Sequence, residues 1–367
     1  MGSIDRKYIT YNIQHITYHM TPIVLDNIVF AIQRFGGIST VWGELLRRAC
    51  ADKELALQIL DYPNDNMVCR ELLVPSEQII AMPYRRAERY RMPDWQPTTP
   101  TVFHSSYFRY CSHPFAKNIT TVHDLTYHYY RHGLAKAVHL WEEQRALRHS
   151  EAVICVSENT KRDLLSIYPW LEEERVHVVY NGVSDAFYPD PSIAKQGYLL
   201  YVGNRSVAYK RFDVAVEVAR RTGLELVALG GALTEKEKLW LDTTLPNRYR
   251  IVSGASMSEF NRYYNEALCL LYPSEYEGFG LPVIEAQKAG CPVIAQESSS
   301  IPEVIGGGWM VKAHSVHMVD EMVEIVRQIQ SRSIEAEIEK GICHAAQFSW
   351  DKTYEQTKAI YTKIINQ

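Results

Sequence analysis

The sequence predicts an α/β protein of two lobes, each a doubly wound parallel sheet with helices on both faces. Short apolar runs alternate with amphipathic stretches almost from end to end, which is the pattern of successive βαβ units. The chain has 367 residues and is therefore too long for one ordinary hydrophobic core. The same fold class, repeated in two lobes, explains both observations.

The first domain is expected over residues 1–190. It should begin with a strand at 23–30, followed by a turn and a helix for which Ser39 is the cap. Further strands are predicted at 55–60, 101–104, 118–122, 152–156 and 176–180. The segment 188–197 then has the proline, glycine and polar content of a linker, so we place the domain boundary at residue 190.

The second domain is expected over 191–349, where the βα alternation starts again. Its strands are predicted at 198–202, 224–229, 250–252, 267–272 and 291–295, with helices at 212–221 and 281–289. The last stretch, 350–367, predicts an amphipathic helix because its apolar residues recur at helical spacing. Spacing alone allows this helix to pack on either lobe.

Composition and charge exclude several classes of protein. Lys plus Arg number 39 against 43 for Asp plus Glu, a net charge of -4, so no nucleic-acid partner is indicated. The seven cysteines are scattered without a Cys-x-x-Cys pair, which predicts reduced thiols. The sequence also shows no signal peptide and no apolar run of about 18 residues, so we expect a cytoplasmic protein.

The strongest motif runs from Glu277 to Glu285, where an apolar strand ends in a glycine-bearing loop and a helix begins. Pro282 is expected at the first helical position, and Gly290 just past the helix end. Such a loop lies at the carboxyl end of a parallel strand, where open α/β sheets bind ligands. Free backbone N–H groups at 280–283 would suit a phosphate. The two carboxylates are then expected to touch different parts of one extended ligand.

A cation-bearing loop, 203–211, also joins a predicted strand to a predicted helix. Arg205 offers a planar fork for phosphate oxygens and Lys210 a mobile point charge, so together they could neutralise a diphosphate. Taken alone, a solvated surface loop would explain these cations equally well. Both this loop and the Glu277 loop follow strands of one lobe, and that placement favours a shared anionic ligand.

Three weaker features lie in the first lobe. His123 follows a predicted strand and could donate a hydrogen bond to a ligand, although Asp124 beside it also suits a purely structural histidine. Gly36 and Gly37 form a phosphate-compatible turn that equally suits a tight βα connection. A basic run interleaved with tyrosines could meet an anionic surface or an acceptor, or be a solvated helix face: Arg85, Arg86, Arg89 and Arg91.

Taken in order, these segments resemble the retaining glycosyltransferases of family four, which have the GT-B fold of two facing Rossmann-like lobes. The resemblance covers nearly the whole chain from about residue 23, and its specific element is Glu277 and Glu285 around Gly-Phe-Gly-Leu-Pro. Shorter segments match too: Gly36-Gly37, Val122-His123-Asp124, Val156-Ser157-Glu158, Asn181-Gly182-Val183, and Arg205 with Lys210. The N-terminal residues 1–22 have no counterpart in the family pattern and no assigned role.

The resemblance implies roles for these positions. The catalytic group would be His123, Arg205, Lys210 and Glu277, with the two cations on the diphosphate and Glu277 on the donor sugar. The donor would also be held by Gly36, Gly37, Asn204, Gly278, Phe279, Gly280, Leu281 and Glu285, the last on the ribose. The first lobe would take the acceptor, and the last helix would cross back to it.

The function expected from this resemblance is transfer of a sugar from a UDP- or GDP-sugar to a saccharide or lipid-linked saccharide acceptor, in the synthesis of a surface polysaccharide. No cofactor is expected, and no metal, because an Asp-x-Asp motif that would hold an ion on a diphosphate is missing. A peripheral contact with the inner membrane face would follow from a lipid-linked acceptor. A GT-B phosphorylase, a nucleotide-sugar epimerase and a non-catalytic donor-binding subunit remain alternatives.

Overall fold

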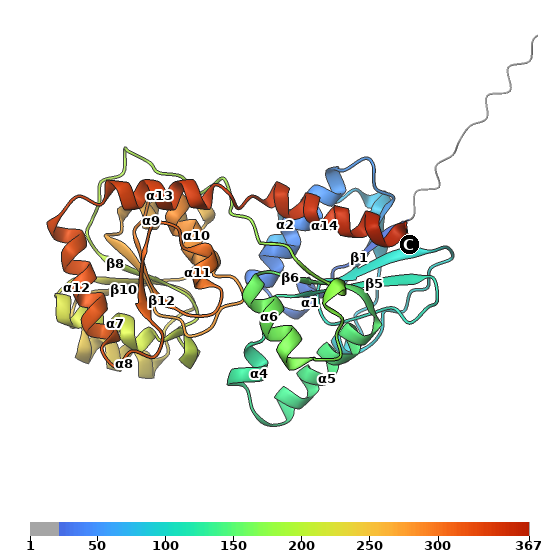
Figure 1. Cartoon of the computed structure of the whole chain (residues 1–367), viewed down its shortest axis with the longest axis horizontal. Coiled ribbons are helices and arrows are strands. Elements are labelled where there is room, and N and C mark those ends of the chain that lie inside the picture. Colours follow the sequence, from blue (N-terminus) through green and yellow to red (C-terminus); the bar gives the residue numbers. More distant parts are fainter. Residues whose placement is uncertain (1–21, 367) are drawn as a thin grey trace, which may run out of the picture.

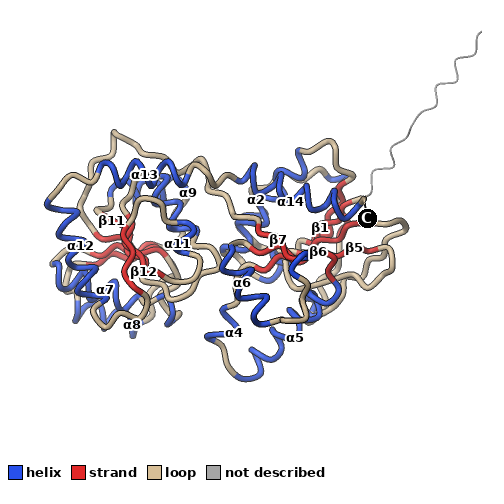
Figure 2. Tube along the Cα trace, viewed as in Figure 1, coloured by secondary structure: helices blue, strands red, loops and turns tan. Residues whose placement is uncertain are grey.

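The computed structural model describes residues 22–366 and contains two α/β lobes that lie side by side (Figure 1). The first lobe is built on a seven-stranded sheet and the second on a six-stranded sheet. The strands form a middle layer between helices in both lobes (Figure 2). The predicted fold class is therefore confirmed. The N-terminal stretch without an assigned role lies outside the described residues, apart from its last one.

The first sheet is parallel throughout, in the order β3-β2-β1-β4-β5-β6-β7. Its strands are β1 (Ile23–Asp26), β2 (Leu57–Asp61), β3 (Ile79–Ala81), β4 (Thr101–Ser105), β5 (Ala116–Val122), β6 (Ser150–Cys155) and β7 (Val176–Val178). The helices of this lobe are α1 (Ile28–Ile32), α2 (Gly37–Ala51), α3 (Met67–Arg70), α4 (Thr126–Tyr130), α5 (Gly133–His149) and α6 (Glu158–Ile167).

The second sheet is also parallel, in the order β10-β9-β8-β11-β12-β13. Its strands are β8 (Leu199–Val202), β9 (Leu226–Leu229), β10 (Tyr249–Val252), β11 (Cys269–Tyr272), β12 (Val293–Glu297) and β13 (Trp309–Lys312). Its helices are α7 (Phe212–Thr222), α8 (Glu235–Thr244), α9 (Met257–Glu266), α10 (Leu281–Lys288), α11 (Ile301–Val304), α12 (Met318–Ser331) and α13 (Glu335–Ala345). The strand order reverses between β8 and β11, which is where such sheets bind ligands.

Two local predictions for the first lobe are wrong. The strand expected at 23–30 ends at Asp26, and the apolar residues that follow form α1 instead, because a short buried run has no period that separates strand from helix. Ser39 is not the cap of α2. Gly36 occupies that position, and the Ser39 hydroxyl lies within the first turn, where it donates to the Gly36 carbonyl at 2.8 Å.

The last helix, α14 (Trp350–Ile365), packs on the first lobe, beside α2 (Figure 1). Its buried side chains join the core of that lobe, among them Tyr354, Ile360 and Tyr361. The Tyr361 hydroxyl lies 2.7 Å from Nδ1 of His104 on β4. The chain thus crosses between the lobes twice, once after β7 and once before α14.

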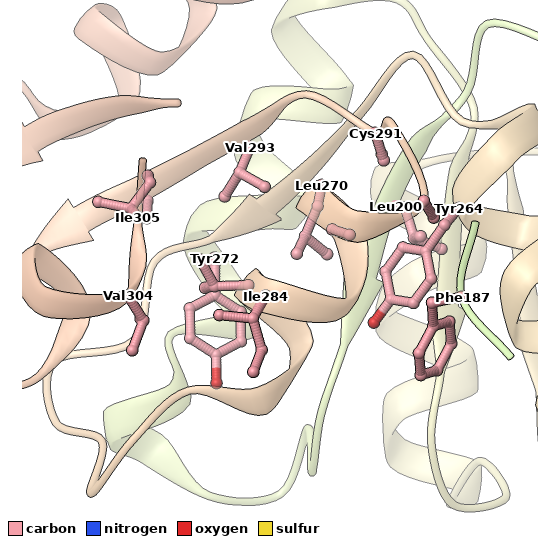
Figure 3. Close-up of a cluster of buried hydrophobic side chains, with 14 of the residues drawn as sticks. Phe187, Leu200, Tyr264, Leu270, Tyr272, Ile284, Cys291, Val293, Val304 and Ile305 are labelled. Atoms are coloured by element: carbon pink, nitrogen blue, oxygen red, sulfur yellow. The ribbon is translucent and has the colours of Figure 1, made fainter. Parts of the chain in front are cut away.

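Apolar side chains cover both faces of the second sheet. The cluster facing α10 includes Leu270, Ile284 and the rings of Tyr264 and Tyr272 (Figure 3). These two phenols carry polar ends into the protein near the loop between β11 and α10. Among the helices of the described residues, none has the length and apolar character that a bilayer crossing requires.

Candidate active site

The two loops singled out in the second lobe follow β8 and β11, the neighbouring strands at which the strand order reverses. They are tied to each other at the carboxyl edge of the sheet. The backbone N–H of Glu275 donates to the carbonyl of Tyr209 at 2.8 Å. Arg211 Nη1 lies 3.0 Å from Oε1 of Glu275. The two loops therefore form one surface at the switch point of the sheet.

Lys210 and Glu277 meet at the centre of this surface. The lysine Nζ lies 2.6 Å from each carboxylate oxygen of Glu277, and the Tyr272 hydroxyl donates to Oε1 at 2.7 Å. Glu277 is only 8% exposed, so water screens this pair weakly. Burial and the nearby Glu277 carboxylate raise the pKa of Tyr272 well above its ordinary value. The phenol therefore keeps its proton and holds the carboxylate as a donor.

The loop after β12 fixes the main chain around Glu277. The backbone N–H of Glu277 donates to the Ser299 hydroxyl at 2.8 Å, and the Glu277 carbonyl accepts from the Ser300 hydroxyl at 3.0 Å. Ser299 has φ 46°, in the left-handed region that non-glycine residues seldom occupy. A residue held in such a conformation next to a buried ion pair is typical of a functional site.

Glu285 lies on α10, one face of which borders the same loop. Its Oε2 accepts from the Tyr264 hydroxyl at 2.9 Å, and Tyr264 belongs to the cluster in Figure 3. Burial raises the pKa of Glu285 to about 7, although the hydrogen bond from Tyr264 opposes this. Tyr264 supports Glu285 as Tyr272 supports Glu277, so each carboxylate has a buried phenol as its partner.

Arg205 is turned away from this pair. Its Nη2 donates to the carbonyls of Gly231 and Ala232 at 2.7 and 3.1 Å, and its Nε lies 3.5 Å from Glu237. The guanidinium thus holds the loop after β9. Contact between Arg205 and a diphosphate stays a prediction, and it requires the guanidinium to leave these partners. Asn204 is exposed, and its Oδ1 accepts from the backbone and hydroxyl of Ser206.

Gly278 lies at the contact between the lobes. A Cβ at this position would overlap the carbonyl oxygen of His123, so the close approach requires glycine. The Gly278 carbonyl accepts from the hydroxyls of Ser157 and Thr160, at 2.7 and 3.1 Å. The sequence assigned this glycine to donor binding, and the structure adds a contact with the first lobe that the motif did not indicate.

His123 reaches the site from the first lobe, directly after β5. Burial lowers the pKa of its imidazole to about 4, and the nearby Asp124 only partly opposes this shift. The ring is therefore neutral near pH 7. A neutral imidazole can donate one hydrogen bond, but it brings no positive charge to a ligand.

The remaining predicted donor-binding residues lie at two helix starts. Gly280, with φ 98°, is the N-cap of α10, and Leu281 is its first residue, so Pro282 stands one position later than predicted. Phe279 is 4% exposed, which leaves only its backbone for a ligand. On the first lobe, the turn of Gly36 and Gly37 opens α2 in the same way.

Aromatic and acidic contacts hold the two lobes together around the site. The Tyr276 hydroxyl donates to Asp163 at 2.9 Å, and the rings of Tyr130 and Tyr209 lie 4.5 Å apart. Glu303 of the second lobe accepts two backbone N–H groups at the start of α6, both at 2.8 Å. The motifs gave no sign of these residues, nor of Tyr264, Tyr272 and Ser299. Most of their partners are distant in the sequence, and Tyr272 reads as an ordinary core residue of β11.

Two families of known proteins match the chain in adjoining stretches. Glycosyltransferase Family 4 matches residues 69–187, and Glycosyl transferases group 1 matches residues 187–334. The point where they meet lies in the connection between β7 and β8. Each family therefore accounts for much of one lobe.

Individual known proteins are similar to the chain across both lobes. The O-antigen chain mannosyltransferase B of Escherichia coli is 26% identical over 291 residues, which cover 71% of this chain and 74% of that protein. HepE of Anabaena, solved in complex with UDP-glucose, has a TM-score of 0.71 at 14% identity, covering 94% of this chain and 100% of that one. WaaG, a glycosyltransferase involved in lipopolysaccharide biosynthesis, has a TM-score of 0.70 at 17% identity, covering 93% and 99%.

Two parallel Rossmann-like sheets that face each other across a seam place the molecule in the GT-B class. Within that class, the chain belongs to the group 1, family 4 glycosyltransferases, and it is a glycosyltransferase.

Proposed function

We propose that the chain transfers a sugar from a UDP- or GDP-sugar to a saccharide or lipid-linked saccharide with retention of anomeric configuration, in the synthesis of a surface polysaccharide. The Lys210–Glu277 pair at the switch point of the second sheet carries this proposal. Support for the donor comes from the HepE complex with UDP-glucose, and support for the process from the O-antigen enzyme of E. coli.

Lys210 would supply the charge that the leaving group needs. Breaking the anomeric bond leaves negative charge on the diphosphate, and a fixed cation there stabilises the transition state more than the ground state. In the free protein this cation is paired with Glu277. A bound diphosphate would pair with the Lys210 ammonium group alongside Glu277. The Glu277 carboxylate would then be oriented toward the donor sugar. No metal is proposed for this step.

The other residues would position the donor. Glu285 would accept from the ribose hydroxyls, and the start of α10 at Gly280 would offer backbone N–H groups to a phosphate. Neutral His123 would donate to the sugar from the first lobe, near the turn of Gly36 and Gly37. Retention would follow from attack on the same face that the diphosphate leaves, with the leaving oxygen taking the proton of the acceptor hydroxyl.

Nucleotide binding tests the donor site before any acceptor is known. The melting temperature should rise with millimolar UDP or GDP in buffer that contains EDTA, and the rise should vanish in Lys210→Ala. Lys238→Ala on α8 is the matched control, since Lys238 is exposed and, among residues 22–366, forms its ion pair with Asp242. Absence of any shift in the unmodified chain with either nucleotide would contradict the proposal.

Product analysis tests the reaction itself. Incubation of a nucleotide sugar with an acceptor should release nucleoside diphosphate and give a glycoside with the anomeric configuration of the donor, as read by NMR. Consumption of the donor with inorganic phosphate instead would identify a phosphorylase. Conversion of the donor without either partner would identify an epimerase.

A further inference from the structure

A second site candidate lies on the first lobe, outside the proposed donor site. A shallow surface pocket is bordered by the turn Glu88–Tyr90, the loop after β4 and one face of α5. Its lining includes four arginines and a single carboxylate, that of Glu142. The remaining lining is mostly aromatic. The pocket is therefore both cationic and suited to a flat apolar surface.

Two of the four arginines are neutralised by partners in the wall. Arg89 Nη2 lies 2.9 Å from Oε2 of Glu142. Arg109 is buried, and its guanidinium lies 3.3 Å from Glu88 and 3.6 Å from Asp26. These contacts build the floor of the pocket, and the carboxylates neutralise the charges of Arg89 and Arg109.

The other two arginines, Arg91 and Arg145, have no such partner. No carboxylate oxygen between residues 22 and 366 lies within 4.0 Å of either guanidinium. Arg145 is held instead by aromatic groups: it donates to the Tyr110 hydroxyl at 2.8 Å and lies 4.3 Å from the centre of the Trp141 ring. Aromatic partners orient a guanidinium without neutralising it. Among the described residues, the pocket thus keeps two guanidinium groups that make no direct ion pair.

We propose that this pocket binds a phosphate group carried by the acceptor, with Arg91 and Arg145 as its ligands and Trp141 as the surface for the attached sugar. One guanidinium fork satisfies a carboxylate, whereas a phosphate has enough oxygens to accept from two separate arginines. The inference rests on the proposed function, because it identifies the pocket as part of the acceptor site of that reaction.

A chain of side-chain contacts links the pocket to the segment that follows His123. Arg89 donates to the Tyr107 hydroxyl at 2.9 Å, and this hydroxyl lies 3.5 Å from Nδ1 of His139. The His139 ring stacks on Tyr127 at 3.7 Å, and Tyr127 belongs to α4, which begins just after His123. Under the proposed function, an acceptor anchored by its phosphate would extend from the pocket toward the sugar to be transferred.

Titration with inorganic phosphate, followed by ³¹P NMR or calorimetry, tests the site without knowledge of the acceptor. The double variant Arg91→Gln with Arg145→Gln should weaken phosphate binding at least about tenfold, because two charge-assisted hydrogen-bonding groups are lost. Arg91→Glu, which changes an exposed side chain only, should do the same without any risk to folding. Arg86→Gln is the matched control, since Arg86 is exposed in the same basic run and does not line the pocket.

Vesicles identify the source of the phosphate. If it belongs to a lipid, the double variant loses sedimentation with phosphatidylglycerol vesicles, while Arg86→Gln and Arg148→Gln keep it. If it belongs to a free sugar phosphate, only the titration changes. Equal phosphate affinity in the double variant and the unmodified chain would overturn the proposal. Nucleotide-induced stabilisation, measured on the same samples, reports the donor site separately, so failure of the proposed function is distinguishable from failure of this inference.

Discussion

The two lobes balance their charges differently. In the second lobe, Lys210 and Glu277 neutralise each other and are fixed by a buried phenol and by the neighbouring serine loop. In the first lobe, His123 is neutral, and within residues 22–366 no carboxylate pairs directly with Arg91 or Arg145. The second lobe thus arranges its opposite charges in advance, whereas under the two proposals above the charge of the first lobe is completed by a ligand.

The largest expected effect concerns Lys210. Lys210→Ala should lower the rate of sugar transfer by about 10²–10³, the cost of removing one preorganised contact from a transition state. Lys210→Arg keeps the charge and should recover part of the rate. Initial rates at saturating donor provide the measurement. A Lys210→Ala enzyme of normal rate would break the comparison, because the paired charges would then be structural.

Glu285 should make stability depend on pH. Its pKa in the folded chain is raised to about 7, so its stabilising effect is complete below the unfolded value of 4.5 and is lost as pH rises through 7. Relative to Glu285→Gln, the unmodified chain should lose on the order of 3 kcal/mol of unfolding free energy over this window. Urea unfolding of both proteins at pH 4.5 and pH 8 checks it. If the difference in unfolding free energy between the two proteins is the same at both pH values, Glu285 is solvated.

Gly278→Ala tests the contact between the lobes. The added methyl group would overlap the His123 carbonyl, so we expect a loss of about 1–3 kcal/mol in stability together with reduced activity. Gly231→Ala is the control, since a Cβ there meets nothing within 4 Å and the stability should change by less than about 0.5 kcal/mol. Equal melting temperatures for the two variants would mean that the lobes separate freely at this point.

Arg205 should show the smallest effect on the reaction. Because its guanidinium holds the carbonyls of Gly231 and Ala232, Arg205→Ala should lower the transfer rate by less than about tenfold, well below the effect of Lys210→Ala. Rates measured side by side would sharpen the comparison. A loss as large as that for Lys210 would show that Arg205 moves to the diphosphate on binding.

The sequence predicted the parts of the site that are local in the chain. Glu277, Glu285 and Lys210 stand beside strand ends and glycines, and a parallel sheet brings such loops together. The same reasoning predicted the two-lobed fold, because it depends only on the alternation of short apolar runs. This reasoning could not tell a strand from a helix after Asp26, because the short apolar segment there would be buried as a strand or as a helix.

The motifs did not predict the hydrogen bonds of core side chains or the contacts between distant segments. The Tyr272 and Tyr264 phenols look like ordinary core residues until their hydroxyls are seen to reach the carboxylates. The sequence placed Arg205 and Lys210 in one loop and assigned both to the diphosphate. The structure shows that the Arg205 guanidinium instead binds carbonyls of the loop after β9. The pocket of Arg91 and Arg145 joins residues 54 positions apart, and the sequence showed only a basic run.

The two crossings between the lobes touch each other. The backbone N–H of Val183 in the first crossing donates to the carbonyl of Phe348 in the second at 3.2 Å, and Gly182 leaves no room for a side chain against Trp350. A cut in the second crossing would leave the lobes joined by the first crossing. A cut in the first crossing would leave them held together by the packing of α14 on the first lobe. Limited digestion should accordingly yield cut molecules whose lobes stay associated until the fragments are denatured.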